Sequence, residues 1–183
     1  MPGAGPYDMS STSRYIVSLA TNDNPQITGF VFKAYDRWHG WNRLRDQNMF
    51  QLPYNTVVDT YYDGTRGSTE IRSALTVTTA NLFATTFRSD FLGGGEATVK
   101  SGFAANDIYD WVPVSPTQLF HGADDTIVPY SNSTTALNAM NSASVTLVGC
   151  NLPVGFREHE ACVPDFLGKM FNWFDSLAAD LRP

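Results

Sequence analysis

The sequence predicts an α/β protein with a partial parallel sheet and a mainly helical cap. Three observations lead to this prediction. Of the 183 residues, 43% are hydrophobic and 16% charged, and disordered chains instead combine low hydrophobicity with high net charge. The last 70 or so residues show the periodicity of a strand, a helix and a second strand. The longer N-terminal block is rich in aromatic residues and broken by Gly, Pro, Asn and Asp, which predicts short elements joined by turns.

Residues 1–112 are predicted to form the end of a core strand followed by a helical lid or cap. Turn residues interrupt this block at Asn24-Pro25, Asp63-Gly64 and Gly93-Gly94-Gly95, where the backbone conformations of glycine and proline favour a change of direction. Between such interruptions we expect short helices at about 11–20, 26–36, 54–61, 68–74 and 76–85.

Residues 113–183 are predicted to form the core segment. We expect a strand at about 117–121, a helix at about 131–143 and a second strand at about 144–149. Ser131 or Ser133 is a plausible N-cap of this helix, since a serine hydroxyl can accept a hydrogen bond from a free backbone N–H. A strand, helix, strand order predicts parallel strands joined by a right-handed crossover.

The last segment is predicted to be an amphipathic helix that starts near Pro164-Asp165, a favourable helix opening. Its apolar residues recur at helical spacing, namely Phe166, Met170, Trp173, Phe174, Leu177 and Leu181. We expect this stripe to close one face of the sheet.

Charge and hydropathy exclude several classes of partner. A net charge of −6 argues against nucleic acid, because phosphate binding depends mainly on Lys and Arg. No apolar run is long enough to span a bilayer, and the chain has no signal peptide at its start. A low lysine content with many Asn, Thr and Ser nevertheless suggests a secreted or periplasmic protein whose signal was lost with an upstream segment. No cofactor is expected, since the glycine run lacks the context of a phosphate loop.

Asp125 is the first candidate functional residue. It follows the predicted strand in the run His121-Gly122-Ala123-Asp124-Asp125-Thr126-Ile127-Val128-Pro129, where an α/β fold would place an acid that orients an imidazole. Asp124 is the neighbouring alternative, although the spacing to Val128-Pro129 favours Asp125. The structural alternative is a turn former whose carboxylate binds nearby backbone N–H groups.

His159 is the second candidate, as the base that this acid would orient. It lies 34 residues after Asp125, a separation that suits one helix, one strand and a loop. The alternative is a histidine in a solvated loop that has no catalytic role. Cys150 and Cys162 flank the histidine, so they either form a disulfide that pins the loop or remain two buried thiols. Their spacing is not that of a metal site.

These motifs resemble the α/β-hydrolase superfamily. The run from His121 to Pro129 is similar to the acid-bearing turn of that family, and Glu158-His159-Glu160-Ala161-Cys162 to its histidine segment. The opening Ala4-Gly5-Pro6-Tyr7-Asp8 resembles the strand end that precedes the lid in secreted lipase-like and esterase-like members. The resemblance implies a truncated hydrolase core, with Asp125 as acid and His159 as base of a carboxylic ester hydrolase acting on a small-molecule ester.

The nucleophile of such an enzyme is not identifiable. No segment reads Gly-x-Ser-x-Gly, the strained turn that exposes the family's serine. Ser10, Ser11 and Ser13 follow the opening segment, but none of them has the flanking glycines of a Gly-x-Ser-x-Gly turn. Alternatives are therefore a non-catalytic binding or pseudo-enzyme module, or one half of a two-fragment hydrolase. Because an incomplete parallel sheet leaves edges and apolar faces exposed, we expect a homo-oligomer or a complementing N-terminal fragment.

Overall fold

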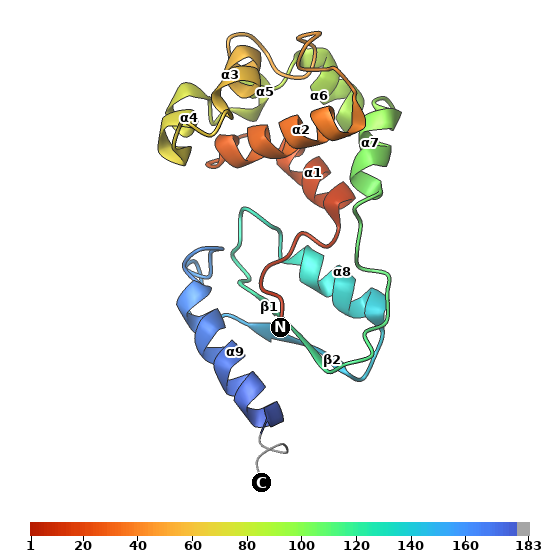
Figure 1. The fold of residues 1–183 in the computed structure, drawn as a ribbon, viewed down its shortest axis with the longest axis vertical. Coiled ribbons are helices and arrows are strands. Elements are labelled where there is room, and N and C mark those ends of the chain that lie inside the picture. The colour runs from red at the N-terminus through yellow and green to blue at the C-terminus, as the bar shows by residue number, and fades with distance from the viewer. Residues whose placement is uncertain (179–183) are drawn as a thin grey trace. The chain divides into compact units, whose positions relative to one another are not determined.

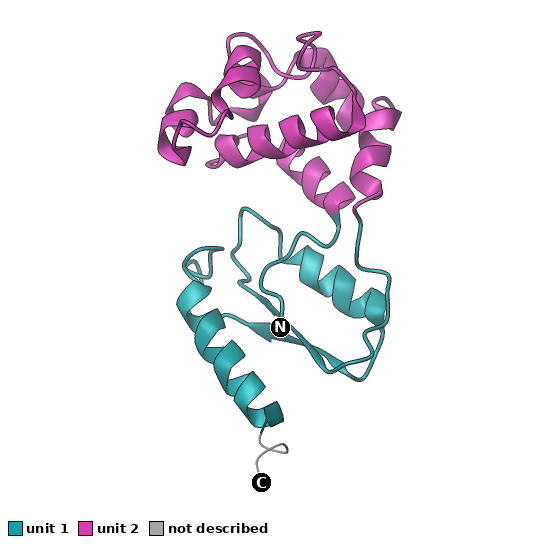
Figure 2. Ribbon diagram, in the orientation of Figure 1, with its two compact units in different colours: residues 1–8, 107–183 teal, residues 9–106 magenta. Residues whose placement is uncertain are grey.

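The computed structural model describes residues 1–178 (Figure 1). The chain divides into two compact units (Figure 2). We call residues 1–8 together with the chain from 107 onward the sheet unit, and residues 9–106 the helical unit. The chain thus enters the helical unit after Asp8 and leaves it after Asn106.

The helical unit consists of short helices linked by turns, as its interrupting Gly, Pro, Asn and Asp residues predict. The helices are α1 (Met9–Ser18), α2 (Pro25–His39), α3 (Tyr54–Tyr61), α4 (Ser68–Ala74), α5 (Thr79–Leu82), α6 (Thr85–Leu92) and α7 (Ala97–Ala104). Helix α2 opens with proline and ends at Gly40, whose φ of 65° lies in the left-handed region that glycine tolerates best.

One expected helix of this unit is wrong. Residues 76–85 do not form a continuous helix: Thr76 to Thr78 are extended or bent, and only Thr79–Leu82 is helical. The adjacent β-branched residues Thr76, Val77 and Thr78 disfavour helix, and Thr78 instead pairs with Thr21 in an isolated bridge. Helices α6 and α7, on either side of the glycine run, were not anticipated.

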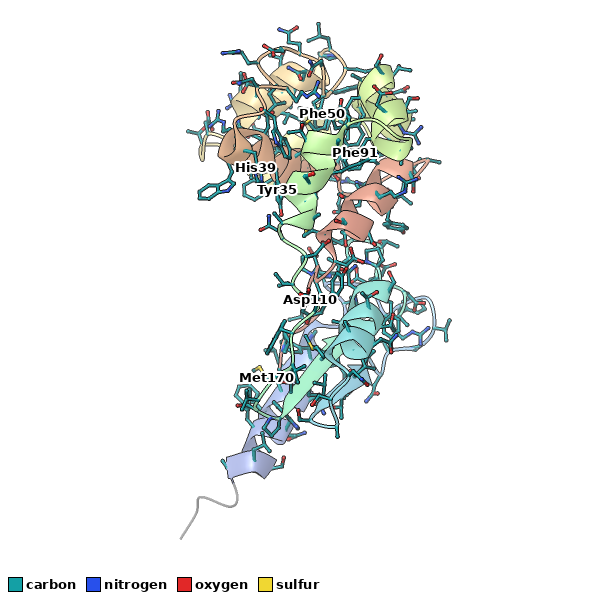
Figure 3. The ribbon with its side chains drawn as sticks, turned by 90° about the vertical axis from the view of Figure 1, so that its right-hand side faces the viewer. Tyr35, His39, Phe50, Phe91, Asp110 and Met170 are labelled. Carbon is teal, nitrogen blue, oxygen red and sulfur yellow. A yellow bond between two sulfur atoms is a disulfide. The ribbon has the colours of Figure 1, made fainter. Side chains whose placement is uncertain are left out.

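A single phenylalanine organises the core of the helical unit. Phe32 of α2 is buried, and its ring meets five other rings edge-on at centroid distances of 5.1 to 6.2 Å, those of Phe50, Phe83, Phe87, Phe91 and Phe103. Edge-to-face contacts of this kind stabilise the fold beyond the contribution of apolar burial alone. The partners come from α6, α7, the residue after α5 and the segment between α2 and α3, so the cluster joins elements remote in sequence (Figure 3).

The sheet unit confirms the predicted order of elements. Strand β1 (Thr117–His121) is followed by α8 (Ser131–Met140), β2 (Val145–Gly149) and α9 (Val163–Ala178). The two strands are parallel, with Thr117 opposite Val145 and His121 opposite Gly149. The N-cap prediction is wrong, because α8 begins at Ser131 itself after Tyr130, without a side-chain cap.

The first residues of the chain extend this sheet on the other edge of β1. Gly3 forms a parallel bridge with Phe120, through bonds from the Phe120 N–H to the Pro2 carbonyl (3.0 Å) and from the Ala4 N–H to the Phe120 carbonyl (2.7 Å). Farther on, the Ile108 N–H bonds to the Tyr7 carbonyl (2.8 Å). The two backbone segments that enter and leave the helical unit are therefore hydrogen-bonded to each other close to that unit.

Side chains on the two faces of β1 alternate, as a strand requires. Leu119 packs with Ala136 and Met140 of α8, whereas Phe120 packs against Phe166 of α9. Helix α8 thus covers one face and the start of α9 the other (Figure 1).

The expectation that α9 closes a face of the sheet with its whole apolar stripe is wrong for the described residues. Only the start of the helix reaches the sheet, and none of its residues is fully buried. Its 16 residues are about 24 Å long, whereas three strands span only about 10 Å. Exposed apolar side chains remain along it, namely Val163, Leu167, Phe171, Phe174 and Leu177. Leu181 lies outside the described residues.

Replacing the central ring tests the core of the helical unit. Phe32→Ala should lower the free energy of unfolding by about 3–5 kcal/mol, because it leaves a cavity among five rings. The matched control is Phe30→Ala on the same helix, where the side chain is 58% exposed and the change should be small. Urea unfolding followed by circular dichroism measures both, and equal destabilisation would contradict the packing described.

Candidate functional site

Asp125 lies in the turn that follows β1. The turn begins at Gly122, where a Cβ would overlap the carbonyl oxygen of Arg157. Only glycine allows the backbone of this turn to approach the 155–162 loop so closely. The turn carries Asp125 to a buried position, with a side chain that has no solvent exposure.

The two carboxylate oxygens of Asp125 have different partners. Oδ1 accepts hydrogen bonds from the backbone N–H groups of Ile127 and Val128, both at 2.9 Å. Oδ2 accepts from Nδ1 of His159 at 2.6 Å and lies 3.2 Å from Nε2 of His121. One oxygen therefore shapes the turn and the other faces two imidazoles, so the turn-forming role and the contact with His159 coexist.

His159 is half-buried, and its two ring nitrogens differ in environment. Nδ1 must donate to Asp125, since a carboxylate can only accept. Within residues 1–178, Nε2 makes no hydrogen bond. The ring is thus oriented from one side and open on the other, which is the arrangement a general base requires.

Two further contacts hold the His159 loop against the turn. Asp124, the alternative acid, pairs instead with Arg157 through both carboxylate oxygens, at 2.9 and 3.2 Å. Its Oδ2 also accepts the N–H of Gly155 at 2.7 Å. Glu158 accepts from the backbone and hydroxyl of Thr126 at 3.2 and 3.1 Å. Adjacent residues of the turn and the loop are thereby connected on both sides of the Asp125–His159 contact.

Cys150 and Cys162 form a disulfide, so the alternative of two buried thiols is wrong. The bond closes the 12-residue separation that contains His159 and fixes Cys162, at the end of this loop, beside the end of β2. A cross-link of this kind restricts the conformations open to the loop, so His159 does not depend on hydrogen bonds alone for its position.

His121 and Ser133 support Asp125 from inside the unit, and both are fully buried. Nε2 of His121 lies 2.9 Å from the Val128 carbonyl as well as 3.2 Å from Asp125. Both neighbours are acceptors, so Nε2 carries a hydrogen. Nδ1 bonds to the Ser133 hydroxyl at 2.7 Å. The sequence did not reveal these supporting contacts; the available signal was a histidine ending a buried strand.

The hydrogen bonds shift the pKa values of the acid and the base in opposite directions. Burial raises the pKa of Asp125, but hydrogen bonds from His121, His159 and the Val128 N–H outweigh burial and hold it below its usual range. The hydrogen bond to Asp125 raises the pKa of His159, while partial burial opposes the increase. The side-chain hydrogen bonds from Arg157 lower the pKa of Asp124 to about 2, despite some desolvation.

A mainly apolar pocket of about 190 Å³ adjoins His159. It is lined by Gly3, Ala4, Phe120, Gly122, His159, Cys162, Val163, Phe166 and Leu167. These residues come from the N-terminal segment, β1, the turn and the start of α9, all within the sheet unit. The imidazole is therefore the titratable group of an otherwise apolar recess.

The three serine candidates belong to the other unit. Ser10, Ser11 and Ser13 lie on α1 of the helical unit, and the hydroxyl of Ser13 donates to the Ser10 carbonyl at 3.0 Å. Over the described range, His, Cys, Asp and Glu side chains nowhere gather in threes that could hold a metal ion. No helix of residues 1–178 is long and apolar enough to cross a membrane.

Comparison with known proteins finds similarity in structure only. No family model and no curated protein matches the sequence. A proposed hydrolase from Legionella pneumophila superposes on 97% of this chain with a TM-score of 0.83 and 22% identity, over 47% of its own length. A G231F mutant of the rice cell wall degrading esterase LipA from Xanthomonas oryzae superposes on 99% with a TM-score of 0.77 and 22% identity, over 50% of its length.

These similarities establish an α/β fold like that of hydrolases. A ligand-bound form of LipA matches 82% of this chain with 23% identity and a TM-score of 0.72. The chain spans about half the length of these solved structures. At this level of identity the likeness shows the fold alone.

The pKa of His159 tests the acid and base contact directly. In the folded chain we expect its NMR titration midpoint above the usual 6.5, and Asp125→Asn should lower it because the carboxylate is lost. Asp110→Asn, an exposed carboxylate of the same unit (Figure 3), is the matched control and should leave it unchanged.

The sign of the pH dependence of stability follows from the same shift. Because folding raises the pKa of His159, its contribution is fully present below about 6.5 and is lost as pH rises through the folded-state value. The part of the wild-type stability advantage over Asp125→Asn that comes from protonated His159 should disappear across that interval. A titration midpoint that Asp125→Asn leaves in place would refute the coupling.

Proposed function

We propose that this chain carries the acid and the base of a carboxylic ester hydrolase of the serine-hydrolase type, with Asp125 as acid and His159 as base. One observation carries the proposal: Nδ1 of His159 donates to a buried carboxylate at 2.6 Å, while Nε2 makes no hydrogen bond within residues 1–178 and the residue lines an apolar pocket. The hydrolase-like fold supports it by analogy.

In the proposed reaction, Nε2 removes the proton from a hydroxyl as the hydroxyl oxygen attacks the ester carbonyl. Asp125 stabilises the imidazolium that forms and keeps the ring in place through Nδ1. The imidazolium then returns the proton to the departing alcohol, and a water molecule repeats the sequence to release the acid. Because folding raises the pKa of His159, the neutral base becomes available only at a higher pH than in an unperturbed histidine.

The nucleophile is the part of the proposal that lies outside the site described above. No serine of the described sheet unit occupies a Gly-x-Ser-x-Gly turn, and Ser10, Ser11 and Ser13 belong to the helical unit. We propose that the hydroxyl comes from a separate segment, so that this chain is one half of a two-fragment hydrolase. The helical unit would then act as the lid over the small-molecule ester.

The surface of the sheet unit supports such a partner. Phe120 bonds to the residues on both sides of Gly3, so the N–H and carbonyl of Gly3 point away from β1, toward the open edge of the sheet. The exposed apolar side chains of α9, such as Phe171 at 68%, lie in the same unit. An open edge and an apolar helix face both favour association with another polypeptide.

Turnover of 4-nitrophenyl butyrate tests the acid and base roles. In the purified chain, which lacks the proposed nucleophile, His159 can activate only a water molecule, so hydrolysis is slow. His159→Ala and Asp125→Asn should each reduce this slow rate by about 10²-fold or more, because general base catalysis is lost. His39→Gln is the matched control; its exposed ring stacks on Trp41 in the helical unit and the rate should not change. A rate unchanged by both substitutions would contradict these roles, and no hydrolysis above the uncatalysed background would favour the non-catalytic binding module.

Labelling with a fluorophosphonate identifies the nucleophile. The isolated chain should not be labelled if the hydroxyl comes from a separate segment. Label on Ser10, Ser11 or Ser13, located by peptide mass analysis, would place the nucleophile within the chain and reject the two-fragment proposal.

The mass in solution tests the partner surface. Size-exclusion chromatography with light scattering should show association above the 20.2 kDa monomer, and an apolar dye should bind. Phe171→Ser combined with Phe174→Ser should reduce both signals, because these side chains are exposed on α9. A clean monomer without dye binding would contradict the expected association.

A further inference from the structure

A second recess lies wholly within the helical unit, among helices α1, α6 and α7, which pack against one another (Figure 1). It has a volume of about 180 Å³ and is lined by Ser10, Ser13, Arg14, Phe91, Lys100 and Phe103. Neither Asp125 nor His159, which belong to the sheet unit, is among its lining residues.

The floor of this recess is aromatic. Phe91 of α6 (Figure 3) and Phe103 of α7 are buried, and their rings meet edge-on with centroids 6.1 Å apart. A dry cavity of about 150 Å³ is large enough to bind benzene. The recess can therefore hold a single ring or a short alkyl chain against the two phenylalanines.

The charged groups at the rim are both cations. Lys100 is held in place by the carbonyls of Gly93 and Asp90, at 2.7 and 3.3 Å. These bonds use two of its three ammonium hydrogens. Arg14 is exposed on α1, and within residues 1–178 its guanidinium makes no hydrogen bond or ion pair.

This local charge is opposite to that of the chain, which has 18 acidic and 12 basic residues. In the described part of the chain no carboxylate lines the recess. A cationic rim above an apolar floor distinguishes between ligands: a bare anion would leave the phenylalanines without contact, and a neutral apolar ligand would not engage the cations.

We propose that this recess binds a monocarboxylate with a compact apolar body, an aromatic ring or a short alkyl chain. The Arg14 guanidinium would take the carboxylate through two parallel hydrogen bonds, the usual geometry of this pair, and Lys100 would contribute its third hydrogen. The ring or chain would lie on Phe91 and Phe103. The site is independent of the proposed ester hydrolysis, and its occupancy is measured without turnover.

Binding of benzoate to the full chain tests the proposal by two-dimensional NMR. Benzoate should shift backbone amides of α1, α6 and α7 with a dissociation constant on the order of 1 mM. Benzyl alcohol, which has the ring without the charge, and acetate, which has the charge without the ring, should each bind at least about tenfold more weakly, because each loses one of the two contacts.

Substitutions at the rim provide the second arm. Arg14→Gln and Lys100→Gln should each weaken benzoate binding about tenfold. The control is Arg45→Gln, which removes an exposed arginine of the same unit paired at 3.4 Å with Asp46 and should leave benzoate binding unchanged. If Arg14→Gln unfolds in a thermal melt, Arg14→Lys replaces it and should bind with intermediate affinity, since it keeps the charge but not the paired donors.

Three outcomes would overturn the site: equal affinity for benzoate and benzyl alcohol, amide shifts confined to other elements, or an equal loss of affinity in Arg45→Gln. Esterase activity enters none of these measurements, so failure of the carboxylate site and failure of the proposed hydrolysis are distinguished.

Discussion

The candidate site depends on the way one buried carboxylate divides its two oxygens. Oδ1 of Asp125 accepts the backbone N–H groups of Ile127 and Val128, which fixes the turn, and Oδ2 faces the imidazoles of His159 and His121. A buried carboxylate is tolerated only when its hydrogen-bonding capacity is satisfied, and here it is satisfied by groups from the turn, the strand end and a loop remote in sequence. The same bonds that stabilise the charge also fix the direction of the His159 ring.

The surroundings of Asp125 show how a short sheet can position a histidine 34 residues away. Gly122 allows the turn and the 155–162 loop to touch, and the Asp124–Arg157 pair and the Cys150–Cys162 disulfide hold that loop. Each of these contacts restricts His159 independently. An imidazole restrained in this way loses little conformational entropy when it accepts a proton, which suits the role of base that we propose.

The two units differ in how completely they bury their own apolar surface. The helical unit encloses Phe32 within a shell of aromatic rings, so its helices find their partners within the unit. The sheet unit leaves the edge at Gly3 open and exposes much of the apolar stripe of α9. This contrast is the physical basis for our proposal that the nucleophile lies on a polypeptide that covers the sheet unit, and for treating the cationic recess of the helical unit as a separate feature.

The sequence alone determined the order of strand, helix, strand and terminal helix, because an apolar run at 117–121 and the helical spacing of apolar residues in the last segment are local properties. It also singled out Asp125 and His159, whose proximity remained a hypothesis. Only the tertiary structure decided which oxygen of Asp125 meets which group, that Cys150 and Cys162 pair, and that His121 and Ser133 stand behind the carboxylate. It also revealed two helices around the glycine run and the exposed stripe of α9. Such features depend on contacts between residues far apart along the chain, and local periodicity carries no information about them.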